Sequence, residues 1–216
     1  MRRPALLAVA HGTRSAPGQR QIRDLVGAVA RRRPDLDVHL SYVDVQGPRI
    51  ADVVTDRAVI VPLLLSTGYH VRVDIAAAAG ERATVTPPLG PDPVLLDSLR
   101  RRIPPADAVV LAAAGSSDPG WRAGVATIAE QLNAHVAYAS GAARRVPDVV
   151  AELRRAGAQR ISVAAYLLAE GLFYRSLHGA GADSVTAPLC QDPAVAGLVV
   201  RRYDLALRSA LSYQAR

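Results

Sequence analysis

Three side chains able to bind a metal or accept a proton follow three apolar segments of this sequence. His11 ends the run ALLAVAH, Asp44 ends SYVD, and His70 follows LLLSTGY. Two neutral imidazoles and a carboxylate suit a divalent transition metal such as iron, cobalt, nickel or zinc. Imidazole also titrates near neutral pH, so the same histidines could instead accept protons from a substrate.

The apolar segments alternate with segments of helical periodicity, which is typical of a parallel sheet covered by helices on both faces. We expect four strands in the first half of the chain, at residues 5–10, 36–45, 58–65 and 85–89. We expect four helices between and after them, at residues 19–33, 48–54, 71–80 and 92–102. The carboxyl ends of parallel strands share one edge, where ligands bind, so the three side chains are expected to lie together there.

The second half of the chain repeats the first. VAHGTRSAPG recurs as AAAGSSDPG, and TVTPPLGPDP recurs as SVTAPLCQDP. We therefore predict a duplicated α/β unit with lobes at residues 1–103 and 104–216. At the three candidate positions the second copy carries Ala114, Ser140 and Phe173. The ligand-type residues are lost as a set while the framework remains, which predicts a site in the first lobe only.

All 26 basic residues are arginine, and the formal net charge is +7. Without lysine the chain can have neither a P-loop lysine nor a Schiff-base lysine, so we expect no nucleotide cofactor. Arginine binds carboxylates and phosphates through paired hydrogen bonds, which suits an anionic partner. Arg14 and Arg72 lie next to the candidate histidines and are our candidates for holding substrate carboxylates. Aromatic residues make up only 4 % of the chain, so nucleic acid is not the expected partner.

The single cysteine and the short apolar stretches indicate the cellular compartment in which we expect the protein. Cys190 is the single cysteine, which excludes an internal disulfide and a thiolate metal cluster. The apolar patch of the N-terminus is too short for a signal peptide, so we interpret it as the first strand. No apolar stretch approaches the roughly 18 residues of a membrane helix. We expect a cytoplasmic protein that is not bound to a membrane.

Three motifs in this order, AHGTR, SYVDVQGP and LLLSTGYHVRVDI, resemble the sirohydrochlorin chelatases, the CbiX/SirB-type members of the class II chelatases. The resemblance implies two flavodoxin-like (chelatase-like) lobes that face each other across a cleft. It implies a lyase-type enzyme that inserts a divalent metal into the tetrapyrrole sirohydrochlorin without ATP. With Fe²⁺, our first choice, the product is siroheme, and with cobalt it is a corrin precursor. The alternative is a cobalt (or nickel) chelatase that acts on the same tetrapyrrole.

The resemblance also implies residue roles. His11 and His70 would bind the metal and receive the pyrrole protons, and Asp44 would be a third metal ligand at a position where relatives often carry glutamate. Single-lobe relatives pair as dimers, so the fused two-lobe chain is expected to act as a monomer.

Two other functions remain open on the residues alone. A protein that carries metal or tetrapyrrole without turnover would need the same ligands. A phosphohydrolase is disfavoured, because histidine phosphatases have an arginine immediately before the histidine and this chain has Ala10 there. His39 and His135 occupy the same position in the two repeats, so we expect them to belong to the scaffold. His178 is expected at a helix end or turn.

Overall fold

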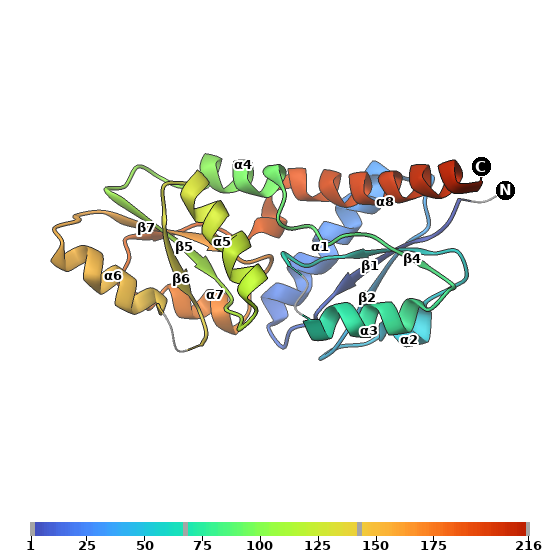
Figure 1. Ribbon diagram of the computed structural model, residues 1–216, viewed down its shortest axis with the longest axis horizontal. Helices are drawn as coiled ribbons and strands as arrows, with labels where there is room; N and C mark the ends of the chain where they lie inside the picture. Colours follow the sequence, from blue (N-terminus) through green and yellow to red (C-terminus); the bar gives the residue numbers. More distant parts are fainter. Residues whose placement is uncertain (1–2, 67–68, 142–143, 215–216) are drawn as a thin grey trace. The chain divides into compact units, whose positions relative to one another are not determined.

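The computed structural model describes residues 3–66, 69–141 and 144–214. The chain forms two compact units, one made of Met1–Gly90 with Pro193–Arg216 and the other of Pro91–Asp192. Each unit contains a four-stranded sheet in which every pair of neighbouring strands is parallel, with helices on both faces (Figure 1). The predicted fold class is therefore confirmed.

The first sheet has the strand order β2-β1-β3-β4, which follows the flavodoxin-like order 2-1-3-4. Its strands are β1 (Leu6–Ala10), β2 (Val38–Tyr42), β3 (Val59–Pro62) and β4 (Thr84–Val85). Its helices are α1 (Ala16–Arg32), α2 (Ile50–Val53), α3 (Tyr69–Ala79) and α8 (Pro193–Gln214). Helices α1 and α8 lie on one side of the sheet and α2 and α3 on the other (Figure 1). Strand β1 is buried along its whole length, as its unbroken apolar run predicts.

The second sheet repeats this arrangement with the order β6-β5-β7-β8. Its strands are β5 (Ala108–Ala113), β6 (His135–Tyr138), β7 (Ile161–Tyr166) and β8 (Ser184–Val185). Its helices are α4 (Pro93–Arg102), α5 (Pro119–Gln131), α6 (Val146–Arg155), α7 (Leu172–Leu177) and the short 3₁₀ helix η1 (Leu189–Gln191). The register is also repeated, because Leu7 pairs with His39 in the first sheet and Val110 with His135 in the second.

The two compact units exchange one helix relative to the expected lobes 1–103 and 104–216. Helix α4, which ends the first repeat, belongs to the second unit, and α8, which ends the second repeat, belongs to the first. One arginine anchors each exchanged helix in the same way. Arg102 Nη1 donates to the carbonyl oxygens of Ala187 and Pro188 at 3.0 and 3.1 Å. Arg202 Nε and Nη2 donate to those of Pro88 and Leu89 at 3.1 and 3.3 Å.

Helix α1 begins at Ala16, three residues before the expected start at residue 19. Ser15 is the N-cap, and its Oγ accepts a hydrogen bond from Gly18 N, while Pro17 lies in the first turn. The apolar face predicted for this helix is buried, and its members are Ile22, Leu25, Val26 and Val29. The early start shortens the loop after β1 to residues 11–15, which holds His11 and Arg14 close to the edge of the sheet.

Within the described residues, no helix is both long enough and apolar enough to cross a bilayer.

Candidate functional site

The backbone joins His11 and Asp44 at the carboxyl edge of the first sheet. The ladder between β1 and β2 continues past the strands, since Val43 N donates to Ala10 O at 2.9 Å and Asp44 N donates to His11 O at 3.0 Å. Both side chains are exposed. Two of the three candidate ligands therefore stand next to each other, as the topology predicts.

A glycine permits this close approach in both repeats. Gly12 has a φ of +101°, and a Cβ at this position would lie 2.1 Å from Asp44 O. Gly115 has a φ of +112°, and its Cβ would lie 2.6 Å from Ser140 O. The second copy builds the same turn with Ala114 in place of His11. The turn requires the glycine and does not require the histidine.

The side chains of Gln46, Gln19 and Thr13 hold the segment that carries Arg14. The amide of Thr13 donates to Gln46 Oε1 at 2.9 Å, and Gln19 Nε2 donates to Thr13 O at 2.8 Å. The amide of Ser15 donates to Thr13 Oγ1 at 3.1 Å. Arg14 itself is exposed between these anchored residues, so its guanidinium lies at the surface beside the carboxyl edge.

Asp44 is an ionised carboxylate with an arginine beside it. Arg49 Nη1 lies 3.0 Å from Asp44 Oδ1, and the Asp44 side chain remains 61 % exposed. The pKa of the Asp44 carboxyl lies below its usual range, because the Val45 N–H donates to it and the Arg49 guanidinium lies beside it. At neutral pH the group is therefore an anion that can bind a cation.

His70 and Arg72 are placed by the backbone alone. Both lie at the start of α3, and their side chains are outside the residues that the structure describes. Strand β3 is the other neighbour of β1, and Leu63 N donates to Val9 O at 2.7 Å where β3 ends. The helix that carries His70 thus follows from the same edge as His11. Among the described side chains, no group of three or more histidine, cysteine, aspartate or glutamate residues is arranged to hold a metal.

The second copy has an apolar edge at the corresponding place. Ser140 Oγ donates to Ala114 O at 2.7 Å, so the hydroxyl is used to close the turn. Phe173 at the start of α7 is 39 % exposed and Leu172 is 72 % exposed. Among the three residues that replace the candidate ligands, none offers a metal a carboxylate or an imidazole. The second copy therefore lacks, at these three positions, the side chains that could bind a metal or accept a proton as an imidazole or a carboxylate does.

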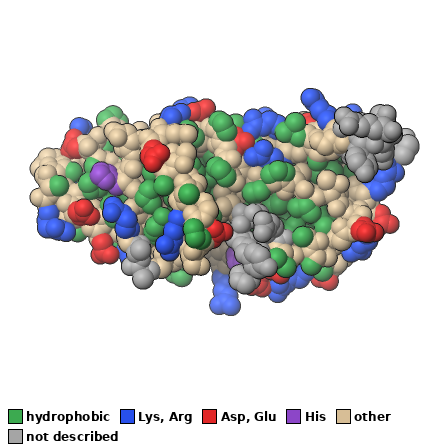
Figure 2. All heavy atoms as spheres, viewed as in Figure 1, with side chains coloured by type: hydrophobic (Ala, Val, Ile, Leu, Met, Phe, Trp, Pro, Cys, Tyr) green, Lys and Arg blue, Asp and Glu red, His purple; other side chains and the backbone are tan. Residues whose placement is uncertain are grey.

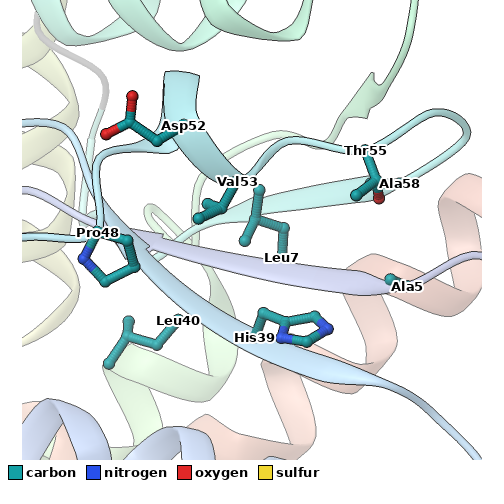
Figure 3. Close-up of a pocket in the computed structure, with 9 residues that line it drawn as sticks. All are labelled: Ala5, Leu7, His39, Leu40, Pro48, Asp52, Val53, Thr55 and Ala58. Carbon is teal, nitrogen blue, oxygen red and sulfur yellow. The ribbon is translucent and has the colours of Figure 1, made fainter.

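The remaining histidines lie where the sequence analysis expects them. His39 Nε2 lies 2.9 Å from Asp37 Oδ1 on the edge strand β2, and His178 follows the end of α7 with its ring 5.0 Å from that of Tyr174. His39 also lines a pocket of about 390 Å³ between α2 and the sheet (Figure 3). Its lining includes Ala5 and Ala58, which directly precede β1 and β3 at the edge of the sheet opposite to His11.

On the face of the molecule that Figure 2 shows, the charged side chains do not form a uniform basic surface. On the face visible in Figure 2, arginine side chains are interspersed with acidic and hydrophobic ones. Several arginines bind carbonyl groups or carboxylates of the chain itself, as Arg49 and Arg102 do. The net charge of +7 is therefore no argument by itself for binding nucleic acid.

Three residues of the site escaped the sequence analysis: Gly12, Gln46 and Arg49. A signal for two of them was present. Gly12 recurs as Gly115, and Arg49 recurs as Arg145 at the same spacing that relates Tyr42 to Tyr138. Gln46 has no such counterpart, and only the structure shows that its side chain reaches the Thr13 amide.

Comparisons with known proteins agree with this architecture. SirB from Bacillus subtilis with Fe³⁺ has a TM-score of 0.76 and 22 % identity, with 96 % of this chain and 97 % of that chain covered. SirB from Bacillus subtilis subspecies spizizenii in complex with cobalt has a TM-score of 0.69 and 20 % identity, with 93 % of each chain covered. CbiX, described as the terminal enzyme for biosynthesis of siroheme in denitrifying bacteria, has a TM-score of 0.71 and 22 % identity, with 94 % and 99 % covered.

These identities support the fold. A comparison with curated protein sequences gives no significant match. The family assignment comes from the CbiX family model, which matches the chain twice, at residues 5–106 and 108–206. The two matches coincide with the two repeats, so nearly the whole chain is covered. The chain therefore belongs to the CbiX family.

Proposed function

We propose that this protein inserts a divalent metal, Fe²⁺ in the first instance, into sirohydrochlorin without ATP, and that it does so in the cytoplasm as a monomer. The observation that carries the proposal is the backbone hydrogen bond between Asp44 N and His11 O, which places a histidine and an aspartate side by side at the carboxyl edge of the first sheet. The second repeat keeps this turn and lacks both side chains. Solved relatives named as SirB have been seen with Fe³⁺ and with cobalt, which supports a metal as substrate.

Insertion of a metal into a tetrapyrrole requires a metal site next to proton acceptors. We assign the metal to His11, His70 and Asp44, which would leave coordination positions for the pyrrole nitrogens. The two pyrrole N–H protons would pass to His11 and His70 as the metal leaves the imidazoles. A metal bound by these groups is substrate, and each turnover transfers it to the macrocycle.

Arginine would hold the macrocycle. Sirohydrochlorin carries several carboxylates at its periphery, and the guanidinium group binds a carboxylate through two parallel hydrogen bonds. Arg14 is exposed beside His11, and we assign it to one of these carboxylates. We assign Arg72, two residues after His70, to a second.

The test is a metal panel with sirohydrochlorin, followed by the absorbance change on insertion. Fe²⁺, Co²⁺ and Ni²⁺ are compared with the spontaneous reaction at equal concentrations. We expect turnover above the spontaneous rate, fastest with Fe²⁺. Binding of metal or tetrapyrrole in stoichiometric amount without turnover would instead identify a carrier, and faster turnover with Co²⁺ would identify a cobaltochelatase.

Variants link the activity to the site. We expect His11→Ala to reduce insertion by about 10²-fold or more, the range for loss of a proton acceptor. His39→Ala is the matched control, because His39 is also an exposed histidine of the first sheet but lies away from its carboxyl edge. Equal loss in both variants would contradict the site assignment. Light scattering should give one chain of 22.8 kDa per particle.

A further inference from the structure

One nitrogen of the Arg49 side chain donates two hydrogen bonds. Arg49 Nη1 donates to Val43 O at 2.9 Å and to Asp44 Oδ1 at 3.0 Å. The first contact anchors the guanidinium to the end of β2, and the second pairs it with the proposed metal ligand. About half of the Arg49 side chain is exposed, and 61 % of that of Asp44 is. This is an ion pair at the surface, so it can be exchanged at little cost in free energy.

The second repeat contains the same arginine without the carboxylate. Arg145 Nη2 donates to Ala139 O at 3.1 Å, and its Nη1 approaches Gly141 O at 3.4 Å. Both arginines also form a backbone bridge to the tyrosine that ends the edge strand, Tyr42 or Tyr138. The bond to the strand-end carbonyl therefore belongs to the framework and forms whether or not a carboxylate is near. Arg49 is consequently held beside Asp44 even when Asp44 has another partner.

We propose that Arg49 is a positioning residue that competes with the metal for the Asp44 carboxylate. It holds the carboxylate between turnovers, gives it up when the metal binds, and takes it back when the metal passes to the tetrapyrrole. This inference rests on the proposed function and assigns it a residue that was not among the candidate ligands. No covalent bond changes in the exchange; one carboxylate alternates between two cations.

The expected size of the effect follows from the exposure of the pair. Exposed ion pairs are worth about 0.2–1 kcal/mol, which lowers the apparent affinity for the competing metal by about two- to sixfold. Arg49→Gln should therefore tighten Co²⁺ binding by about two- to sixfold. The same variant should lower both the KM for the metal and kcat of insertion, because the carboxylate then holds the metal without a competitor.

The experiment measures the Kd of Co²⁺ by titration of the full chain, together with KM and kcat. Arg145→Gln is the matched control, because it removes an equivalent bond to a strand-end carbonyl and leaves Asp44 untouched. Asp44→Asn, alone and combined with Arg49→Gln, completes a double-mutant cycle. Arg49→Lys keeps the charge and should restore values close to those of the original protein.

We expect Arg49→Gln to tighten Co²⁺ binding only where Asp44 is present, and Arg145→Gln to change neither Kd nor kcat. The inference is overturned if Arg49→Gln weakens binding or leaves it unchanged. It is also overturned if tightening is equal in the Asp44→Asn background, which would indicate only the loss of a nearby positive charge. The Kd cycle is independent of turnover, so a protein that binds Co²⁺ with this coupling but inserts no metal would refute the proposed function alone.

Discussion

Replacing Gly12 by alanine should lower both the stability of the fold and the rate of metal insertion, whereas the equivalent change in the second repeat should lower the stability alone. The new Cβ would lie 2.1 Å from Asp44 O, whereas an ordinary contact begins at 3.4 Å. The carbonyl must therefore retreat by about 1.3 Å (3.4 − 2.1). At a φ of +101° the alanine is strained in addition. A strained backbone of this kind costs about 1–3 kcal/mol.

The displacement acts directly on the two candidate ligands, because Asp44 O belongs to the residue whose amide donates to His11 O. Misplacement of a reacting group by about 1 Å can cost about 10²-fold in rate. Gly115→Ala is the internal control. It requires a retreat of about 0.8 Å (3.4 − 2.6) from Ser140 O at a similar φ, in the copy without ligand-type residues.

The assay combines urea unfolding, followed by circular dichroism, with the initial rate of metal insertion. We expect both variants to lose about 1–3 kcal/mol of unfolding free energy. We expect Gly12→Ala alone to lose about 10²-fold in rate. Equal loss of rate in the two variants would refute the reasoning, and so would a Gly12→Ala protein with unchanged stability and rate.

Three further predictions follow from the repeat and its contacts. Phe173→His should not create a second site, since the other two positions still lack ligands; an added Co²⁺ equivalent in a titration would contradict this. The pKa of Asp183 lies below its usual range because the Ile161 amide and an arginine donate to it. Its contribution to stability is therefore present above about pH 4 and lost as the pH falls through the folded pKa. Asp183→Asn should flatten this acid dependence, read from the fluorescence of the single tryptophan. Finally, a fragment of residues 91–192 should fold cooperatively by circular dichroism, whereas a fragment of residues 104–216 should not, because only the first keeps its own covering helix.

Strands β1 and β3 were predictable because each lies in a buried apolar run, whereas β4 consists only of the exposed Thr84 and Val85. The duplication was predictable because TVTPPL and SVTAPL preserve a local pattern. The exchange of α4 and α8 was not predictable in the same way. Both helices follow equivalent strands and carry equivalent arginines, Arg102 and Arg202, so their sequences suit either sheet. Which sheet each helix covers is decided by tertiary packing, for example by the buried Tyr203, whose hydroxyl donates to Pro4 O.

The adjacency of His11 and Asp44 was predictable from topology, since neighbouring parallel strands end at a common edge. The role of Arg49 was not visible. Arg49 is one of 26 arginines in the chain, so its residue type alone does not mark it as part of a site. Its recurrence as Arg145 indicates a framework role, and the additional contact with Asp44 depends on side-chain positions that no periodicity encodes.

The two copies also indicate why these positions can carry candidate ligands without loss of the fold. Each turn is closed by backbone hydrogen bonds, Asp44 N to His11 O and Ser140 N to Ala114 O. In the second copy the Ser140 hydroxyl adds a bond to the Ala114 carbonyl, which an ionised carboxylate cannot donate. The Asp44 side chain is therefore released from the turn and receives the Val45 amide and Arg49 instead. The side-chain hydrogen bond that Ser140 adds to the turn of the second copy is thus absent from the first copy, where the Asp44 carboxylate is available to a cation.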